Sequence, residues 1–210
     1  MLADEFTVLV EKESECSMNL SFDFRRYLYD MKLFATIAMA ILVQSQLIFD
    51  FNQTTPVNNW TVVDDVVMGG RSYGRFSIDS EGHGVFSGNV SLENNGGFSS
   101  LRYRFEKINT YENSKIAIRL KGDGKQYQFR IKSNRNTYYS YTTTIKTSGD
   151  WETITIDLKD MYPTFRGQIL NMPHFNENSI EELVFLIGNK KNESFELVLD
   201  RIEIIHSVTP

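Results

Sequence analysis

From Leu47 onward, apolar and polar residues alternate with a period of two, and Gly, Asn and Asp turns interrupt the alternation at short intervals. Side chains of a β-strand point alternately to its two faces, so this pattern predicts strands that bury one face. The expected strands lie near residues 47–51, 73–79, 84–92, 98–105, 115–121, 126–132, 138–145, 151–158, 182–188 and 194–205. Helix is expected only as single turns near 159–163 and 178–182. Many short strands without intervening helices are typical of an antiparallel sandwich or barrel, so the predicted fold class is all-β.

The register of one strand pair follows from Asp123-Gly124, a two-residue hairpin signal. A hairpin closed at this turn gathers six apolar side chains on one face: Ile116, Ile118, Leu120, Tyr127, Phe129 and Ile131. Arg119 and Arg130 then fall on the opposite face, and a slip of one residue would destroy this separation. The same alternation directs Arg102 and Arg104 outward. The sequence therefore predicts one open sheet face that carries arginines.

This open face is a candidate ligand site. Its proposed members are Arg102, Arg104, Arg119, Gln128, Arg130 and Trp151, with Tyr139 and Tyr141 close by if that pair, rather than Tyr138 and Ser140, faces outward. Guanidinium groups beside aromatic planes suit a carbohydrate, a carboxylate-bearing ligand or a peptide segment. The alternative is an ordinary solvated face whose arginines pair with nearby acids, since exposed sheet faces are commonly polar.

The last third of the chain departs from simple alternation. Residues 183–187 are apolar at every position and predict a strand buried on both faces. In the final strand the apolar parity changes, which predicts a bulge near Asp200-Arg201. Residues 159–181 form a long connection without a clear pattern, and such connections are often functional.

Two glycine-containing blocks, residues 60–72 and 86–102, each combine a Gly-Gly pair with polar residues and an aromatic. Such a composition suits a backbone that turns sharply against a packed neighbour. Within the first block, the adjacent acids Asp64 and Asp65 are candidate ligand residues. They suit a bound cation, an arginine partner or a local turn, and a structural hydrogen-bonding role is the favoured interpretation.

The run from Asp64 to Ser72 and the run from Asn94 to Arg102 resemble the complex I intermediate-associated protein family, and the resemblance extends from about residue 49 to 205. A strand led by Trp151, followed by a Phe- and Pro-rich stretch that ends in Arg166-Gly167, also matches the family pattern, so Arg166 is a further candidate. The resemblance implies a galactose-binding-like jelly roll, a fold shared with carbohydrate-binding modules. It also implies a chaperone or assembly role towards a respiratory-complex protein partner.

The resemblance to sugar-binding jelly rolls brings one further expectation. Those folds often carry a structural calcium where the first and last strands meet, which draws attention to Asp50 and Asp200. Calcium needs several converging oxygen ligands, so the expectation depends on more side chains than these two. No other cofactor is expected, and no metal site is assigned.

The N-terminal residues are expected to lie outside the domain. Residues 31–45 combine Met31-Lys32, an apolar run from Leu33 to Val43 and a small-residue exit at Ser45, which predicts a signal peptide and an exported (periplasmic or secreted) protein. The apolar run is shorter than the roughly 20 residues of a membrane-spanning helix, so no stable transmembrane segment is expected. Residues 1–30 are rich in acids and are interpreted as an extension ahead of a true start at Met31, or as a cytoplasmic extension. Residues 46–210 then form the jelly-roll domain.

Charge and missing motifs narrow the function. Once residues 1–45 are removed the domain is close to neutral and has no dense basic tract, which argues against nucleic acid as a partner. Cys16 is the single cysteine, so the domain has neither a disulfide nor a thiol nucleophile. The three histidines are scattered, and no metalloprotease, P-loop or nucleophile-elbow motif is present. We therefore expect a non-enzymatic binding module with a protein partner, or alternatively an exported carbohydrate-binding jelly roll.

Overall fold

The structure is a computed structural model, and it describes residues 43–207. The predicted extension 1–30 and most of the predicted signal peptide 31–45 lie outside the described residues. Residues 43–45 form the beginning of the first strand. Within the described residues, no helix is long and apolar enough to cross a membrane.

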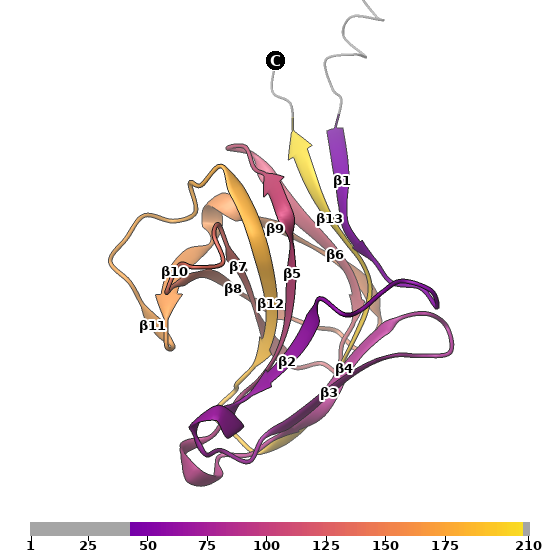
Figure 1. The fold of residues 1–210 in the computed structure, drawn as a ribbon, viewed down its shortest axis with the longest axis vertical. Helices are drawn as coiled ribbons and strands as arrows, with labels where there is room; N and C mark the ends of the chain where they lie inside the picture. The colour runs from indigo at the N-terminus through magenta and orange to yellow at the C-terminus, as the bar shows by residue number, and fades with distance from the viewer. Residues whose placement is uncertain (1–42, 208–210) are drawn as a thin grey trace, which may run out of the picture. The chain divides into compact units, whose positions relative to one another are not determined.

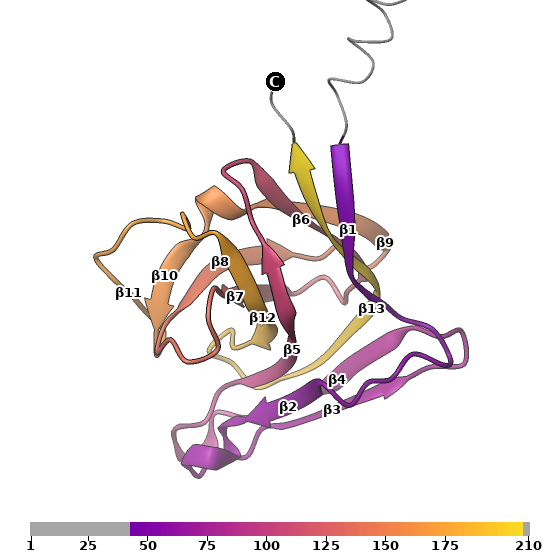
Figure 2. The same ribbon diagram turned by 45° about the horizontal axis from the view of Figure 1, so that its top comes forward.

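Residues 43–207 form two antiparallel sheets packed as a sandwich, which confirms the all-β prediction (Figures 1 and 2). Sheet A has the order β3-β4-β13-β6-β9, with β1 also paired to β13. Its strands are β1 (Val43–Asp50), β3 (Tyr73–Ile78), β4 (Gly84–Val90), β6 (Ser114–Lys121), β9 (Trp151–Asp157) and β13 (Glu193–Ser207). Sheet B has the order β11-β10-β8-β7-β12-β5-β2. Its strands are β2 (Trp60–Asp64), β5 (Ser99–Asn109), β7 (Gln126–Lys132), β8 (Ser140–Lys146), β10 (Tyr162–Phe165), β11 (Gln168–Ile169) and β12 (Ser179–Ile187).

The core lies between the two sheets and is filled by alternate residues of each strand. Leu101, Tyr103 and Phe105 of β5 are buried, as the period-two pattern requires. An aromatic cluster extends this core, with neighbouring ring centroids 4.6 to 6.0 Å apart, and consists of Phe49, Phe51, Trp60, Phe76 and Tyr103. β12 is buried at Leu183, Val184 and Phe185, which agrees with the prediction of a strand covered on both faces.

The predicted hairpin between residues 116 and 131 is wrong, although its burial pattern is right. β6 pairs with β13 and β9 in sheet A, whereas β7 pairs with β12 and β8 in sheet B. All six apolar side chains are buried because they face one another across the core from different sheets. Alternation reports which side of a strand is buried, and the two arrangements bury the same residues.

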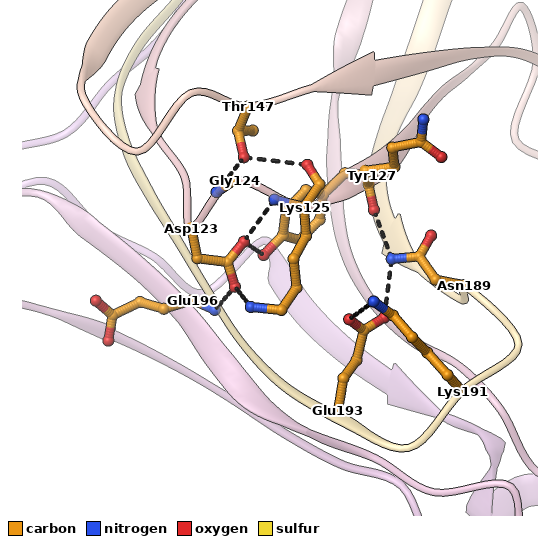
Figure 3. A network of polar contacts seen from close by, with 10 residues as sticks. Asp123, Gly124, Lys125, Tyr127, Thr147, Asn189, Lys191, Glu193 and Glu196 are labelled. Atoms are coloured by element: carbon orange, nitrogen blue, oxygen red, sulfur yellow. Dashed lines mark hydrogen bonds and ion pairs between the residues drawn. The ribbon is translucent and has the colours of Figure 1, made fainter.

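The segment with Asp123-Gly124 therefore carries the chain from one sheet to the other. Asp123 accepts hydrogen bonds from Lys125 Nζ at 2.7 Å and from the Tyr127 hydroxyl at 3.0 Å (Figure 3). The backbone N–H of Glu196 donates to the same carboxylate at 3.0 Å, and Gly124 N–H donates to Thr147 Oγ1 at 3.1 Å. Burial opposes ionisation of Asp123, but these hydrogen bonds and the Lys125 charge outweigh it and lower its pKa.

Other differences from the sequence prediction concern short elements. β2, β10 and β11 were not expected, and the helical turn predicted near 178–182 is instead the start of β12. The single-turn 3₁₀ helices are η1 (Asp65–Met68), η2 (Glu93–Asn95) and η3 (Leu158–Asp160), the last close to the turn predicted near 159–163. The predicted bulge is confirmed, because the pairing of β13 with β6 shifts between Leu199 and Arg201.

Candidate functional site

Asp65 joins the two glycine-containing blocks and is fully buried. Its carboxylate accepts hydrogen bonds from the backbone N–H groups of Gly97 at 2.6 Å, Ser72 at 2.9 Å and Phe98 at 3.1 Å, and from the Ser72 hydroxyl. Burial raises the pKa of this carboxyl, but the four hydrogen bonds outweigh it, so the net pKa is lowered. Asp65 is therefore an ionised group whose oxygens are occupied by the protein itself.

The glycines of both blocks leave room for this carboxylate. A Cβ added to Gly70 would lie 2.3 Å from Asp65 Oδ1, and one added to Gly96 would lie 2.6 Å from Oδ2. Asp64 has a parallel role, because it accepts from the Gly74 N–H at 3.0 Å and from the Ser99 hydroxyl at 2.5 Å. The geometry of both acids is that of structural hydrogen-bond acceptors that tie β2 to the loops around it.

The arginines lie on the outer face of sheet B in cross-strand rows. The central row runs over six neighbouring strands and consists of Thr61, Arg102, Val184, Arg130, Thr142 and Tyr162. The next row contains Arg104, Glu182 and Lys132, and Gln128 lies on the other side of Arg130. We call Arg102, Arg104, Gln128, Arg130, Lys132 and Tyr162 the cation face. Strands β5, β12 and β7, which carry its charges, are adjacent in Figure 2.

The cation face has more positive than negative charge. In the two cross-strand rows that carry these cations, Glu182 is the one carboxylate, and it pairs with Arg104 at 2.8 Å. Within the described part of the chain, neither Arg102 nor Arg130 forms an ion pair, and Arg102 Nε is buried without a hydrogen-bond partner. A buried donor left unpaired costs on the order of 1–3 kcal/mol.

The pKa values on this face reflect the closeness of its positive charges. Burial, and then the neighbouring Arg102 charge, lower the pKa of Arg130. Burial also lowers the pKa of Lys132. The negative charge of Glu182 raises this pKa, and the positive charges of Arg102 and Arg104 lower it further, so that the net pKa is lowered. Neighbouring positive charges disfavour the charged forms of Arg130 and Lys132, and a bound anion would stabilise both charged forms.

Arg130 is held in place by its neighbours. Its Nε and Nη2 donate to Gln128 Oε1 at 3.1 and 2.5 Å. Tyr162 of β10 lies near enough to raise the pKa of Arg130 slightly against the larger effects. Sequence reasoning missed Tyr162 because β10 was not expected, although its place directly after Met161 in the aromatic stretch was visible.

Arg119 and Trp151 belong to the other sheet, so the single predicted platform divides into two. Arg119 lies on the outer face of sheet A, with its guanidinium 5.3 Å from the Trp151 ring centroid. Its Nε also pairs with Asp200 at 2.8 Å. His83 covers the same indole, with ring centroids 4.7 Å apart. Arg119 is thus satisfied by an aromatic ring and a carboxylate, unlike Arg102 and Arg130.

The two remaining candidates lie apart from both faces. Tyr139 has the inward parity of the buried Tyr141, and its ring lies 5.5 Å from that of Tyr141, packed against the core. Arg166 occupies the turn between β10 and β11 with a φ of 48°, and its guanidinium lies 5.2 Å from the Phe165 ring. Neither residue is a member of the cross-strand rows of the cation face.

Asp50 and Asp200 approach each other at the meeting of the first and last strands but turn to different partners. Asp200 pairs with Arg119, while Asp50 lies 4.0 Å from Arg201. In the part of the chain that the structure describes, no group of three or more His, Cys, Asp or Glu side chains is arranged to hold a metal ion. The donor set therefore does not fit the calcium site that the resemblance implied.

A serine and a histidine meet at the far end of sheet A. The Ser114 hydroxyl lies 2.9 Å from His206 Nδ1 and also accepts from the Tyr111 N–H at 2.7 Å. Burial lowers the pKa of His206, and the Tyr111 ring packs edge-on against it at 4.9 Å. Ser114 is thus bonded within its own turn, which is a structural arrangement.

Three surface hollows lie away from the cation face. One of about 330 Å³ is lined by Tyr73, Arg75 and Phe195, one of about 370 Å³ lies between β8 and β9, and one of about 390 Å³ adjoins Tyr111 and His206. We place the candidate site on the cation face nonetheless, because Arg102 and Arg130 lie there partly exposed and without an ion pair in the described residues. A face of this kind suits an extended ligand lying across strands rather than a small molecule enclosed in a cavity.

Comparison with solved structures identifies the fold. The chain is similar to the family 11 carbohydrate-binding module of the cellulosomal cellulase Lic26A-Cel5E of Clostridium thermocellum, with a TM-score of 0.60, 18% identity, and coverage of 79% of this chain and 96% of that one. The same module in complex with a β-1,3-1,4-mixed-linked tetrasaccharide gives a TM-score of 0.58, 18% identity and coverage of 79% and 98%. An agarase, AgWH50C, matches over 78% of this chain and 24% of its own, at a TM-score of 0.51 and 14% identity. The jelly-roll prediction is confirmed at the level of fold.

Comparison of sequences identifies the family. The chain is 20% identical over 148 residues to the mitochondrial complex I intermediate-associated protein 30 of Drosophila melanogaster, covering 60% of this chain and 50% of that protein. The chain thus spans about half the length of this curated relative. The family model of complex I intermediate-associated protein 30 matches residues 49–199, a range that includes β2, η1 and both glycine-containing blocks. The chain belongs to the complex I intermediate-associated protein 30 family.

Proposed function

We propose that this domain is a non-catalytic binding module that holds a carbohydrate on the cation face of sheet B. The observation that carries the proposal is the row in which Arg102 and Arg130 flank Val184 without any carboxylate partner in the described residues, with Tyr162 at its end. Hydroxyl-rich ligands are recognised by guanidinium donors and by aromatic planes against which sugar rings pack. Similar structures include a module bound to a mixed-linked tetrasaccharide, which supports testing glycans first.

The character of the face favours a glycan over an apolar ligand. Around the arginines lie Thr61, Gln128 and Thr144, together with Thr142, which is buried and bonded to the Thr164 hydroxyl. The apolar positions Val184 and Leu186 lie on the central strand, β12. A surface of this kind offers hydrogen-bond donors and acceptors but few apolar pockets. Binding on it is non-catalytic in this proposal, because the one carboxylate of its rows, Glu182, is engaged by Arg104 and no second carboxylate is paired with it there.

The proposal is tested with a glycan array on the full chain and on the double variant Arg102→Gln/Arg130→Gln. Saturable binding by the wild-type protein that the double variant loses is the expected result. Arg119→Gln serves as the matched control, because it removes an arginine from the opposite sheet. Absence of any glycan binding, or binding that depends on Arg119 rather than Arg130, would contradict the proposal.

Family membership favours a second candidate function, an assembly role towards a protein partner of the respiratory chain. The Drosophila relative is named for complex I intermediates, although it is only 20% identical and twice as long as the matched region. This role predicts that respiratory complex I subunits co-purify with the wild-type chain from membranes of its native host. If subunits of that complex are not enriched over an unrelated bait, the assembly role is wrong.

A further inference from the structure

The cation face carries an excess of positive charge, which favours negatively charged glycans over neutral ones. Its rows carry Arg102, Arg104, Arg130 and Lys132 against the single carboxylate of Glu182, which Arg104 already engages. The domain as a whole has no matching excess of positive charge, since residues 46–210 contain 18 Lys and Arg against 20 Asp and Glu. The local excess is therefore a property of this face and not of overall composition.

The spacing of the two unpaired arginines suits a ligand with repeated groups. Arg102 and Arg130 both lie opposite Val184, on the two strands that flank β12. Neighbouring strands are about 4.8 Å apart, so the two Cα atoms are separated by roughly 10 Å. The Gln128 amide holds Arg130, while Arg102 Nε is buried and unsatisfied. Two guanidinium forks at this spacing match planar carboxylates carried at intervals on one extended chain.

The surroundings argue for a polysaccharide rather than an acidic peptide as the carrier. Peptides docked across a sheet face anchor apolar side chains in pockets, whereas the only apolar positions beside these arginines among the described residues are Val184 and Leu186 of β12, and their other neighbours in the rows are threonines, Gln128 and the Tyr162 ring. Hydroxyls and amides satisfy a sugar's hydroxyl groups, and the tyrosine offers a plane for a sugar ring. Binding of an acidic peptide is the competing result, which the titration below measures separately.

From these observations we infer that the cation face binds a polysaccharide containing uronic acids, whose carboxylates lie against Arg102 and Arg130. This inference rests on the proposed carbohydrate-binding function and narrows it to one ligand class. Because the interaction is between charges on an open face, raising the salt concentration weakens it.

Isothermal titration of the full chain with an oligogalacturonate and with the methyl ester of the same oligomer tests the inference, since esterification replaces each carboxylate with a neutral methyl ester on the same sugar backbone. An oligomannuronate is a second acidic sugar, a mixed-linked β-glucan tetrasaccharide is a neutral sugar, and polyglutamate is an acidic peptide. The expected result is binding of at least one uronate at least tenfold tighter than its ester. The affinity should fall at least tenfold in Arg130→Gln and in Arg102→Gln, and remain unchanged in Arg119→Gln.

The possible outcomes separate this inference from the function on which it rests. If the esters or the neutral glucan bind as tightly as the uronates, the site binds glycans but its proposed selectivity for anions is wrong. If polyglutamate alone binds, the ligand class is wrong and a protein partner is favoured instead. If none of these sugars binds while circular dichroism shows an intact β-rich fold, this inference fails. The carbohydrate-binding function fails with it if the glycan array also shows no binding.

Discussion

The backbone N–H of Gly97 donates a 2.6 Å hydrogen bond to Asp65 Oδ2 and so joins the two most family-specific runs of the chain across 32 positions. The same carboxylate takes hydrogen bonds from Ser72 and Phe98, and glycines at 70 and 96 leave space for it. Together these two runs build one buried hydrogen-bonded joint. The joint holds β2 and the start of β5, and thereby one edge of the sheet that carries the cation face.

Replacing Asp65 tests the joint. Asp65→Asn keeps the shape of the side chain but replaces one accepting oxygen with a donor that faces backbone N–H groups. Hydrogen bonds to a charged group contribute about 1.5–3 kcal/mol, so we expect the free energy of unfolding to fall by about 2–3 kcal/mol. Urea denaturation followed by tryptophan fluorescence measures it. Glu93→Gln, which breaks only the exposed ion pair with Arg71, should change stability by less than about 1 kcal/mol.

The same residue makes a pH prediction whose sign follows from its lowered pKa. A carboxyl with a depressed folded-state pKa stabilises the protein above its unfolded pKa of about 3.9, and that stabilisation is lost as the pH falls through the folded value. The difference in unfolding free energy between wild type and Asp65→Asn should therefore be largest at neutral pH and shrink below about pH 4. A difference that stays constant from pH 7 to pH 3 would show that the charge of Asp65 has no part in the effect.

Glycine substitutions separate steric contact from backbone strain. Gly70→Ala places a Cβ 2.3 Å from Asp65 Oδ1, whereas Gly149→Ala meets no atom within 4 Å but sits at a φ of 99°. Strain alone costs on the order of 1 kcal/mol, so the Gly70 variant should be the more destabilised of the two in thermal unfolding. Combining Gly70→Ala with Asp65→Ala should cost less than the sum of the single changes, because the clash disappears. Additive effects would mean that the two residues are not in contact.

Because Arg119 and Arg130 lie on different sheets with different partners, we expect their replacement to affect stability differently. Arg119 contacts Trp151 and Asp200, so Arg119→Gln should reduce stability modestly, by about 1 kcal/mol or less for so exposed a pair. Arg130→Gln should leave stability nearly unchanged or improve it, since it removes one of two crowded cations. Chemical denaturation of the two variants provides the comparison. A large loss of stability in Arg130→Gln would indicate that this arginine holds the sheet together.

Much of the fold was predictable from the sequence because burial alternates along each strand. The interior positions of β5, β6, β7 and β9, and the bulge near Asp200, all follow from that alternation. Sheet membership does not follow from it. Ile118 and Phe129 are equally buried whether they are paired in one sheet or face each other across two, so the Asp123-Gly124 segment was interpreted as a hairpin rather than a crossing.

The candidate site was also only partly predictable, because alternation does not reveal which sheet a strand belongs to. Outward parity correctly places Arg102, Arg119 and Arg130 away from the core, but only sheet order separates Arg119 from the other two. Tyr162 was missed because β10 is four residues long and contains Pro163, which lowers any strand signal. Pairing partners such as Val184, which aligns Arg102 with Arg130, are long-range relationships that local patterns do not contain.

The most direct measurement is a titration of the isotope-labelled full chain with oligogalacturonate, followed through backbone amide chemical shifts. The cation face predicts that shifts concentrate on β5, β12, β7 and β10 around Arg102, Val184, Arg130 and Tyr162, and that they disappear in Arg102→Gln/Arg130→Gln. Shifts concentrated on β6 and β9 around Arg119 and Trp151, or no shifts at saturating ligand, would contradict the account.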